Sequence, residues 1–111
     1  MRRALRIIRH ELALSDLDGH AEYLRTQSSL ETALRFLEAA EATFSDLAAM
    51  PGMGKAREVR NPRLSGLRQW RVVGFEKYLI FYRVSEEVLE VLRVLYGTRD
   101  LDRILEEDEE G

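Results

Sequence analysis

Hydrophobic residues recur with two different periods along the 111-residue chain, and the change of period separates a helical half from a strand-rich half. The stronger helical stripe consists of Leu30, Ala33, Leu34, Leu37, Ala40, Phe44, Leu47 and Ala48. This spacing predicts an amphipathic helix of about five turns. A weaker stripe before it consists of Leu14, Leu17, Ala21 and Leu24 and predicts a first, shorter helix. Residues 26–29 separate the two helices, and Ser28 or Ser29 is expected to cap the second one.

The second half contains three apolar runs of strand length, at residues 67–73, 78–84 and 88–96. The short segments between them predict antiparallel hairpins. A further β-prone run at residues 3–9 predicts a first strand, and residues 100–107 are expected to form a last short helix. The predicted order is β-α-α-β-β-β-α. It describes an α+β fold in which a helical hairpin packs on one face of an antiparallel sheet, while the other face stays partly open.

Alternation within each strand predicts which side chains share a face of the sheet. In the third strand, one face holds Leu79, Phe81 and Arg83, and the other holds Tyr78, Ile80 and Tyr82. In the last strand, Val91, Arg93 and Leu95 are expected opposite Leu92, Val94 and Tyr96. Each arginine among these apolar neighbours must reach solvent, a ligand, or an acid such as Glu76, Glu90 or Asp100.

Charge is distributed unevenly along the chain. Residues 53–83 contain eight Lys or Arg against two acids, whereas residues 84–111 contain three Arg against ten acids. The basic middle predicts an anionic partner, either an acidic peptide or a nucleic acid. The residues expected to contact it are Lys55, Arg57, Arg60, Arg68, Arg93 and Arg99. We expect one domain over residues 1–105, followed by a solvated acidic tail at residues 106–111.

The composition disfavours several other chemistries. The chain has no cysteine and only two histidines, His10 and His20, so we expect neither a metal site nor a cofactor. His20 is expected to be a packing residue at a helix boundary. The chain has neither the long apolar run of a membrane span nor a signal-peptide pattern at its start, which predicts a cytoplasmic protein.

Four stretches of the sequence resemble motifs of one known family. They are Ala13-x-x-Asp16-Leu17 with Tyr23, Ala33-x-x-Phe36-Leu37 leading to Met50-Pro51-Gly52-Met53-Gly54, Leu67-Arg68-x-Trp70 followed by residues 78–84, and Arg93-Val94-Leu95-Tyr96-Gly97-x-Arg99-Asp100. Their order and spacing resemble the ParE/RelE superfamily of type II toxin–antitoxin toxins. The resemblance is strongest to the ParE branch, whose members are often labelled plasmid stabilisation proteins. It implies a toxin held in a hetero-oligomer by a cognate antitoxin with an acidic, amphipathic C-terminal segment.

The same resemblance leaves three functions open. ParE-like members inhibit DNA gyrase and are not enzymes, and this is the leading prediction. RelE-like members are ribosome-dependent mRNA endonucleases, and in that case Arg71, Arg83 and Tyr96 are the expected catalytic residues, with the arginines stabilising phosphate charge. Many ParE-like sequences have His at the position of Tyr96. The third alternative is a non-toxic family member that only binds its antitoxin.

Overall fold

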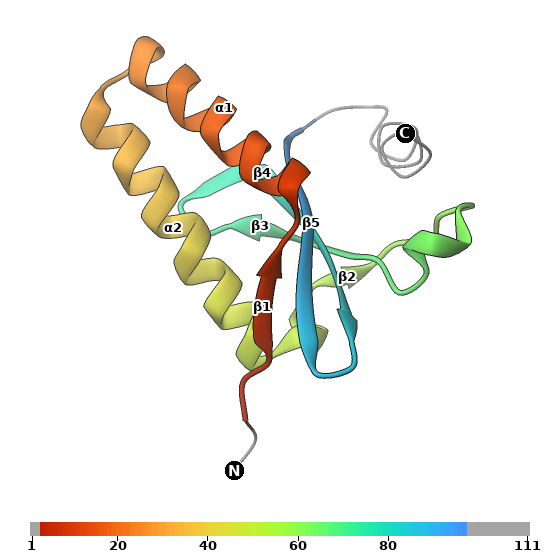
Figure 1. Ribbon diagram of the computed structural model, residues 1–111. Coiled ribbons are helices and arrows are strands. Elements are labelled where there is room, and N and C mark those ends of the chain that lie inside the picture. Colours follow the sequence, from red (N-terminus) through yellow and green to blue (C-terminus); the bar gives the residue numbers. More distant parts are fainter. Residues whose placement is uncertain (1–2, 98–111) are drawn as a thin grey trace.

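The computed structural model describes residues 3–97, which form a helical hairpin packed on one side of a five-stranded sheet (Figure 1). The helices are α1 (Glu11–Gln27) and α2 (Leu30–Ala49). The strands are β1 (Arg6–Arg9), β2 (Lys55–Ala56), β3 (Arg68–Val72), β4 (Phe75–Ser85) and β5 (Val88–Tyr96). Two short 3-10 helices, η1 (Pro51–Met53) and η2 (Pro62–Leu64), lie in the connection between α2 and β3. The predicted α+β architecture is confirmed in this part of the chain.

The sheet has the strand order β1-β5-β4-β3-β2. The pairs β3–β4 and β4–β5 are antiparallel, as predicted from their short connections. β1, however, pairs with β5 in the parallel direction, so the sheet is mixed rather than wholly antiparallel. β2 was not predicted, because its two residues lie within a long polar segment that has no strand pattern.

The ends of the second helix follow the predicted signals. The Ser29 side chain accepts a hydrogen bond from the backbone N–H of Thr32 at 3.0 Å and so caps the start of α2. At the other end, Pro51 begins η1 directly after α2. Proline cannot continue an α-helix, so the chain leaves the helix here and turns toward the sheet.

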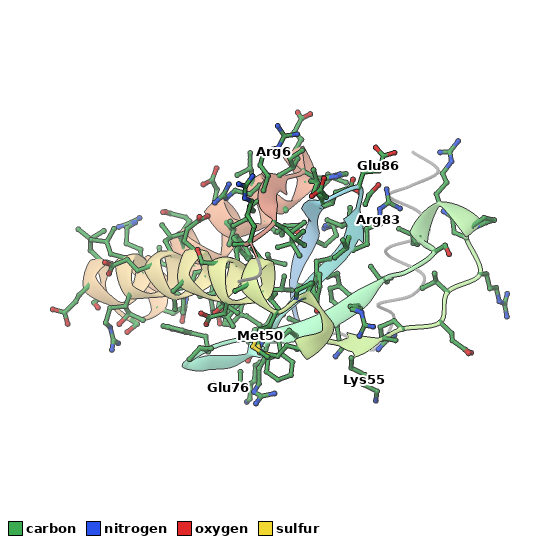
Figure 2. All side chains as sticks on the ribbon, turned by 90° about the horizontal axis from the view of Figure 1, so that it is seen from below. Arg6, Met50, Lys55, Glu76, Arg83 and Glu86 are labelled. Atoms are coloured by element: carbon green, nitrogen blue, oxygen red, sulfur yellow. The ribbon has the colours of Figure 1, made fainter. Side chains whose placement is uncertain are left out.

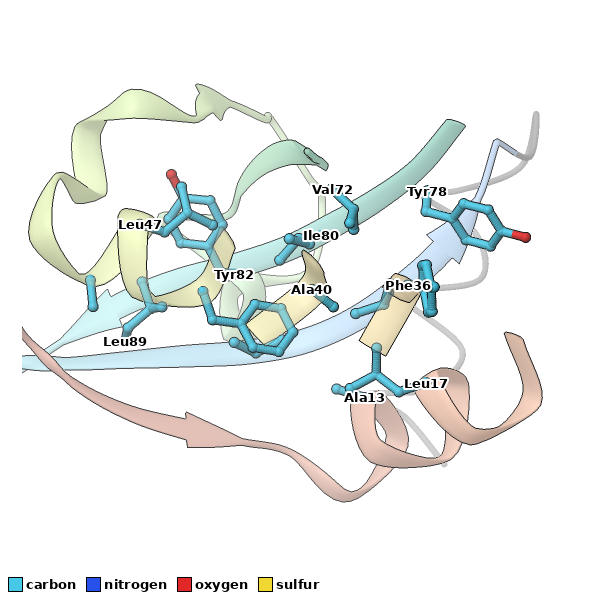
Figure 3. Close-up of a cluster of buried hydrophobic side chains, with 14 residues drawn as sticks. Ala13, Leu17, Phe36, Ala40, Leu47, Val72, Tyr78, Ile80, Tyr82 and Leu89 are labelled. Atoms are coloured by element: carbon cyan, nitrogen blue, oxygen red, sulfur yellow. The ribbon is translucent and has the colours of Figure 1, made fainter. Parts of the chain in front are cut away.

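Apolar side chains from both helices meet the sheet in one main core. The core contains Ala13 and Leu17 from α1, Phe36, Ala40, Phe44 and Leu47 from α2, and Val72, Tyr78, Ile80, Tyr82, Leu89, Val91 and Val94 from the sheet (Figure 3). A smaller cluster on the opposite face of the sheet contains Leu64, Leu67, Phe81, Leu92 and Leu95. The segment between β2 and β3 contributes Leu64 and Leu67 and thus covers part of the face that was expected to be open.

The predicted faces of the last strand are wrong for Val91 and Leu92, because β5 contains a bulge, and right for residues 93–96. Tyr82 pairs with Val91 and Phe81 pairs with Arg93, which leaves Leu92 as an extra residue in β5. From Arg93 onward, successive side chains of β5 again point to opposite faces of the sheet. Val91 and Val94 therefore both lie in the main core, whereas Leu92 and Leu95 lie in the opposite cluster. The predicted faces of β4 are confirmed by the same two clusters.

An ion pair closes the edge of β5 beyond the end of β1. Asp16 of α1 accepts hydrogen bonds from Nε of Arg93 at 2.7 Å, from Nη2 of Arg93 at 2.9 Å and from the backbone N–H of Val94 at 3.0 Å. Both charged side chains are largely buried, with 14% and 13% of their surfaces exposed. A single carboxylate thus satisfies an edge amide and neutralises the arginine that interrupts the apolar strand.

Some expectations fall on residues that the structure does not describe. The predicted last helix at residues 100–107, the acidic tail and Arg99 lie outside residues 3–97. Within the described range, no helix is both long and apolar enough to cross a membrane.

Candidate partner-binding surface

The hydroxyl group of Tyr82 holds the turn that follows α2. It donates a hydrogen bond to the Pro51 carbonyl at 2.7 Å and accepts one from the Gly54 backbone N–H at 2.9 Å. Burial raises the pKa of Tyr82, although the Gly54 hydrogen bond and the charge of Arg68 oppose the shift. The hydroxyl therefore keeps its proton at neutral pH and continues to donate to Pro51.

Gly54 must be a glycine because it lies directly against this tyrosine. A Cβ atom built at Gly54 would lie 2.2 Å from the Tyr82 hydroxyl oxygen and 2.8 Å from two ring carbons. Those ring atoms belong to a fully buried side chain and have little room to move. Gly54 also accepts a hydrogen bond from Nη1 of Arg68 at 2.6 Å through its carbonyl. The turn is thus fixed to both β4 and β3.

This turn leads directly into β2, the strand at the edge of the sheet, and into the basic residues Lys55 and Arg57. Lys55 pairs with Gln69 and Ala56 pairs with Arg68, and the Arg57 guanidinium donates to the Gln69 side-chain oxygen at 2.8 Å. Lys55 is exposed and points away from the ribbon (Figure 2). We define the basic surface as Lys55, Arg57, Arg60 and Arg68. The structure places Lys55 and Arg68 on the paired strands β2 and β3, and Arg57 directly after β2.

Arg83 belongs to a separate charge network. Its Nε donates to Glu90 at 3.1 Å, and its Nη1 donates to the backbone carbonyl of Arg63. The other carboxylate oxygen of Glu90 lies 2.9 Å from Nε2 of His10. Burial by itself raises the pKa of Glu90, but the hydrogen bonds from Arg83 and His10 outweigh it and leave that pKa below its ordinary value. Arg83 therefore ties the segment that contains η2 to the middle of the sheet.

The three residues expected in a nuclease site do not come together. Tyr96 pairs with Tyr78, whereas Arg83 pairs with Glu90, five residues further along β4. Five strand residues span about 17 Å. Arg71 pairs with Leu79, next to Tyr78, but Leu79 contacts the opposite cluster, whereas Tyr96 packs against Tyr78 of the main core. The two arginines and the tyrosine therefore do not surround a common phosphate position.

The remaining predicted residues lie elsewhere. Arg93 is on β5, and its guanidinium is engaged by Asp16, as described above. The Arg71 guanidinium stacks over the ring of Trp70, with its carbon 4.4 Å from the ring centroid. Neither residue belongs to the basic surface. Residues 3–97 hold no group of three His, Asp or Glu side chains that could bind a metal ion.

Sequence reasoning missed the residues that position the basic surface. Tyr82 and Gly54 are 28 positions apart, and nothing local marks their contact. The closest signal is the Met50-Pro51-Gly52-Met53-Gly54 stretch, which predicts a turn but not what the turn packs against. Asp16 was likewise not predicted as the partner of Arg93, whereas Glu90 was one of the acids expected to pair with a strand arginine.

The arrangement of a helical hairpin on a mixed sheet is also seen in a solved structure described as the chromosomal ParDE TA system from P. aeruginosa. That structure matches with a TM-score of 0.67 and 18% sequence identity, over 86% of this chain and 98% of that chain. The two chains therefore share a fold. The family model for the ParE toxin of the type II toxin–antitoxin system, parDE, matches residues 7–101. Because this match spans most of the sequence, the chain belongs to the ParE toxin family. A search of curated proteins gives no match.

The contact between Gly54 and Tyr82 predicts a sharp difference between two neighbouring glycines. We expect Gly54→Ala to lower the free energy of unfolding by about 2 kcal/mol, because the new methyl group overpacks a buried ring. Gly52→Ala is the matched control, since a Cβ atom at Gly52 meets nothing within 4 Å. Urea unfolding at neutral pH measures both changes. Equal stability of the two variants would contradict the proposed role of this contact.

Proposed function

We propose that this chain is a ParE-type toxin that inhibits DNA gyrase and is neutralised by a cognate antitoxin. The family match over residues 7–101 is the observation that carries the proposal. ParE-like toxins act on gyrase, and the family membership supports the proposal of the same target for this chain. We further propose that the toxin and its antitoxin form a hetero-oligomer in the cytoplasm.

The antitoxin is proposed to contact the basic surface. Lys55, Arg57, Arg60 and Arg68 lie on β2, on β3 and in the segment between them, and Glu58 is the acid closest to them in sequence. Cations gathered on one edge attract an acidic peptide from a distance and favour its binding over that of a basic one. An acidic, amphipathic C-terminal segment supplies the complementary charge. Nucleic acid is the other anion that such a surface could attract.

The positions of Arg71, Arg83 and Tyr96 favour gyrase inhibition over RNA cleavage. Attack by a 2′-hydroxyl needs a base, an acid and positive charge within hydrogen-bonding reach of one phosphate. Arg83 and Tyr96 are about 17 Å apart along the sheet, and Arg83 already donates to Glu90 and to a backbone carbonyl. We therefore retain the gyrase function as the proposal and use the nuclease as its competitor.

Inducible expression of the toxin should arrest growth and induce the DNA-damage response. The purified protein should inhibit supercoiling by gyrase in vitro, because a trapped gyrase–DNA complex cannot complete its cycle. A parallel assay of translated mRNA should show no cleavage.

The three functions give different results in this experiment. Cleavage of mRNA without any effect on supercoiling would overturn the gyrase proposal and favour the nuclease. Cleavage that is lost in both Arg83→Ala and Tyr96→Phe would assign those residues to catalysis. Normal growth, together with retained antitoxin binding, would identify a non-toxic member.

Reversing charge on the basic surface should weaken antitoxin binding. The test partner is the product of an adjacent reading frame with an acidic, amphipathic C-terminus. We expect Lys55→Glu with Arg60→Glu to lower its affinity about tenfold and to reduce the dependence of affinity on salt. The control pair, Arg35→Glu with Lys77→Glu, makes the same change in net charge at exposed positions outside this surface. Calorimetry at two salt concentrations measures both, and equal losses in the two pairs would exclude a specific role for the basic surface.

A further inference from the structure

Four aromatic rings line a pocket at the end of the sheet where β5 finishes. They belong to His20 and Tyr23 of α1, Tyr78 of β4 and Tyr96 of β5, and they enclose a volume of about 290 Å³. The pocket lies on the helix side of the sheet, because Tyr78 is part of the main core. Neither gyrase inhibition nor the basic surface as described above makes use of it.

The Tyr78 ring forms the floor of the pocket, and the rings of His20 and Tyr96 stand against it as inner walls. The Tyr96 ring stands at 66° to the Tyr78 ring, with centroids 4.8 Å apart. The His20 ring stands at 76° to the Tyr78 ring, with centroids 4.9 Å apart. His20 is held in place by a contact of 2.7 Å between its Nε2 and the Val94 carbonyl oxygen. Because a carbonyl can only accept, Nε2 carries the proton in this contact. The inner walls are thus fixed by core packing and by β5.

The outer walls are accessible. Tyr23 is 59% exposed and Tyr96 is 49% exposed. No lysine or arginine is among the residues that line the pocket in the described part of the chain. The neighbouring Arg25 is paired with Glu22 at 2.7 Å, and Lys77 precedes Tyr78 on the strand and therefore points to the other face. Among residues 3–97, no lysine or arginine side chain therefore lines the pocket to repel a bound cation.

We propose that this pocket is an aromatic cage that binds a cationic group, namely the ammonium or guanidinium group of a lysine or arginine side chain in a protein partner. The faces of aromatic rings carry partial negative charge, and Tyr23 and Tyr96 are the two lining rings with much exposed surface to offer a cation. Burial, with a smaller effect of the neighbouring Tyr96 and Tyr23, raises the pKa of Tyr78, so its hydroxyl oxygen stays protonated and uncharged at neutral pH. An uncharged apolar group would gain only from its burial, whereas a cation also gains from the rings and oxygens.

With the cage, the molecule has two binding surfaces that prefer ligands of opposite charge. The basic surface lies at the β2 edge and attracts acids, whereas the cage lies between α1 and the end of β5 and attracts cations. The two sites can therefore be occupied independently by oppositely charged parts of partner proteins. The cage also gives Tyr96 a role that needs no proton transfer.

The test compares choline with its uncharged isostere, 3,3-dimethyl-1-butanol, by NMR titration of the full-length chain at constant ionic strength. Choline should produce saturable shifts of the Tyr23, Tyr78 and Tyr96 ring signals, with a dissociation constant on the order of millimolar. The isostere has the same shape and should bind at least about threefold more weakly. Equal or tighter binding of the isostere would overturn the proposal in favour of a purely apolar pocket. The absence of saturable shifts with choline would overturn it as well.

Variants at the exposed walls separate the cage from the fold. Tyr96→Phe keeps the ring face and should retain choline binding within about twofold, whereas Tyr96→Ala should lose most of it. Tyr23→Ala provides a second, independent loss. Both tyrosines are exposed, so circular dichroism and thermal unfolding should remain close to those of the unmodified chain. Undiminished choline binding in both alanine variants would show that the cation binds elsewhere and would refute the assignment.

Discussion

The buried Tyr82 hydroxyl is the contact on which the position of the basic surface depends. It joins the carbonyl of Pro51 and the amide of Gly54 to the centre of β4, across a gap in sequence that no local element spans. The ring itself lies in the core against α2, so the same side chain serves packing and hydrogen bonding. Together with the hydrogen bond from Arg68 to the Gly54 carbonyl, this contact fixes the direction of the chain after α2 and places β2 beside β3.

The structure uses its acidic residues to neutralise arginines within the sheet. Asp16 engages Arg93, and Glu90 engages Arg83, so each arginine on these central strands has a carboxylate partner. The cations of the 55–68 segment face few acids and give this edge its positive charge. Arginines on the central strands β4 and β5 are paired with acids, whereas the cations of this segment lie at the edge, so the small sheet carries many arginines without burying unpaired charge. This arrangement also sets Arg83 and Arg93, which are paired with acids within the sheet, apart from the basic surface, although Arg68 of that surface additionally holds the Gly54 carbonyl.

Elements with strong local signals could be predicted, and those set by distant contacts could not. Both helices and the two hairpins follow from period, capping and short connections. The parallel direction of β1, the bulge at Leu92 and the short β2 depend on partners far away in sequence. The turn at Glu86 and Glu87 is also unusual. Both residues have positive φ angles, of 47° and 66°, where asparagine or glycine would be expected.

For the candidate site too, one property could be predicted from the sequence and another could not. Its charge was evident from composition, because eight cations in 31 residues exceed what an ordinary surface segment carries. Its geometry was not, because the Tyr82 contact and the Gly54 carbonyl that accepts from Arg68 are both long-range. The aromatic pocket was hidden for the same reason. His20 was predicted as a packing residue at a helix boundary, and it does pack against Phe36 and Tyr78, but from the interior of α1 rather than from its end. The pairing of Tyr96 with Tyr78 across β4 and β5, which the sequence does not reveal, brings the Tyr96 ring into the pocket.

Native-state hydrogen exchange of the Gly54 amide tests the central claim most directly, namely that the core fixes the turn bearing the basic surface. We expect this amide to be protected within about tenfold of the central β4 amides, because its acceptor is the buried Tyr82 hydroxyl. In Tyr82→Phe, the Gly54 amide should lose that protection while the β4 amides keep theirs. Exchange of the Gly54 amide near the rate of an unprotected loop in the unmodified chain would contradict the claim.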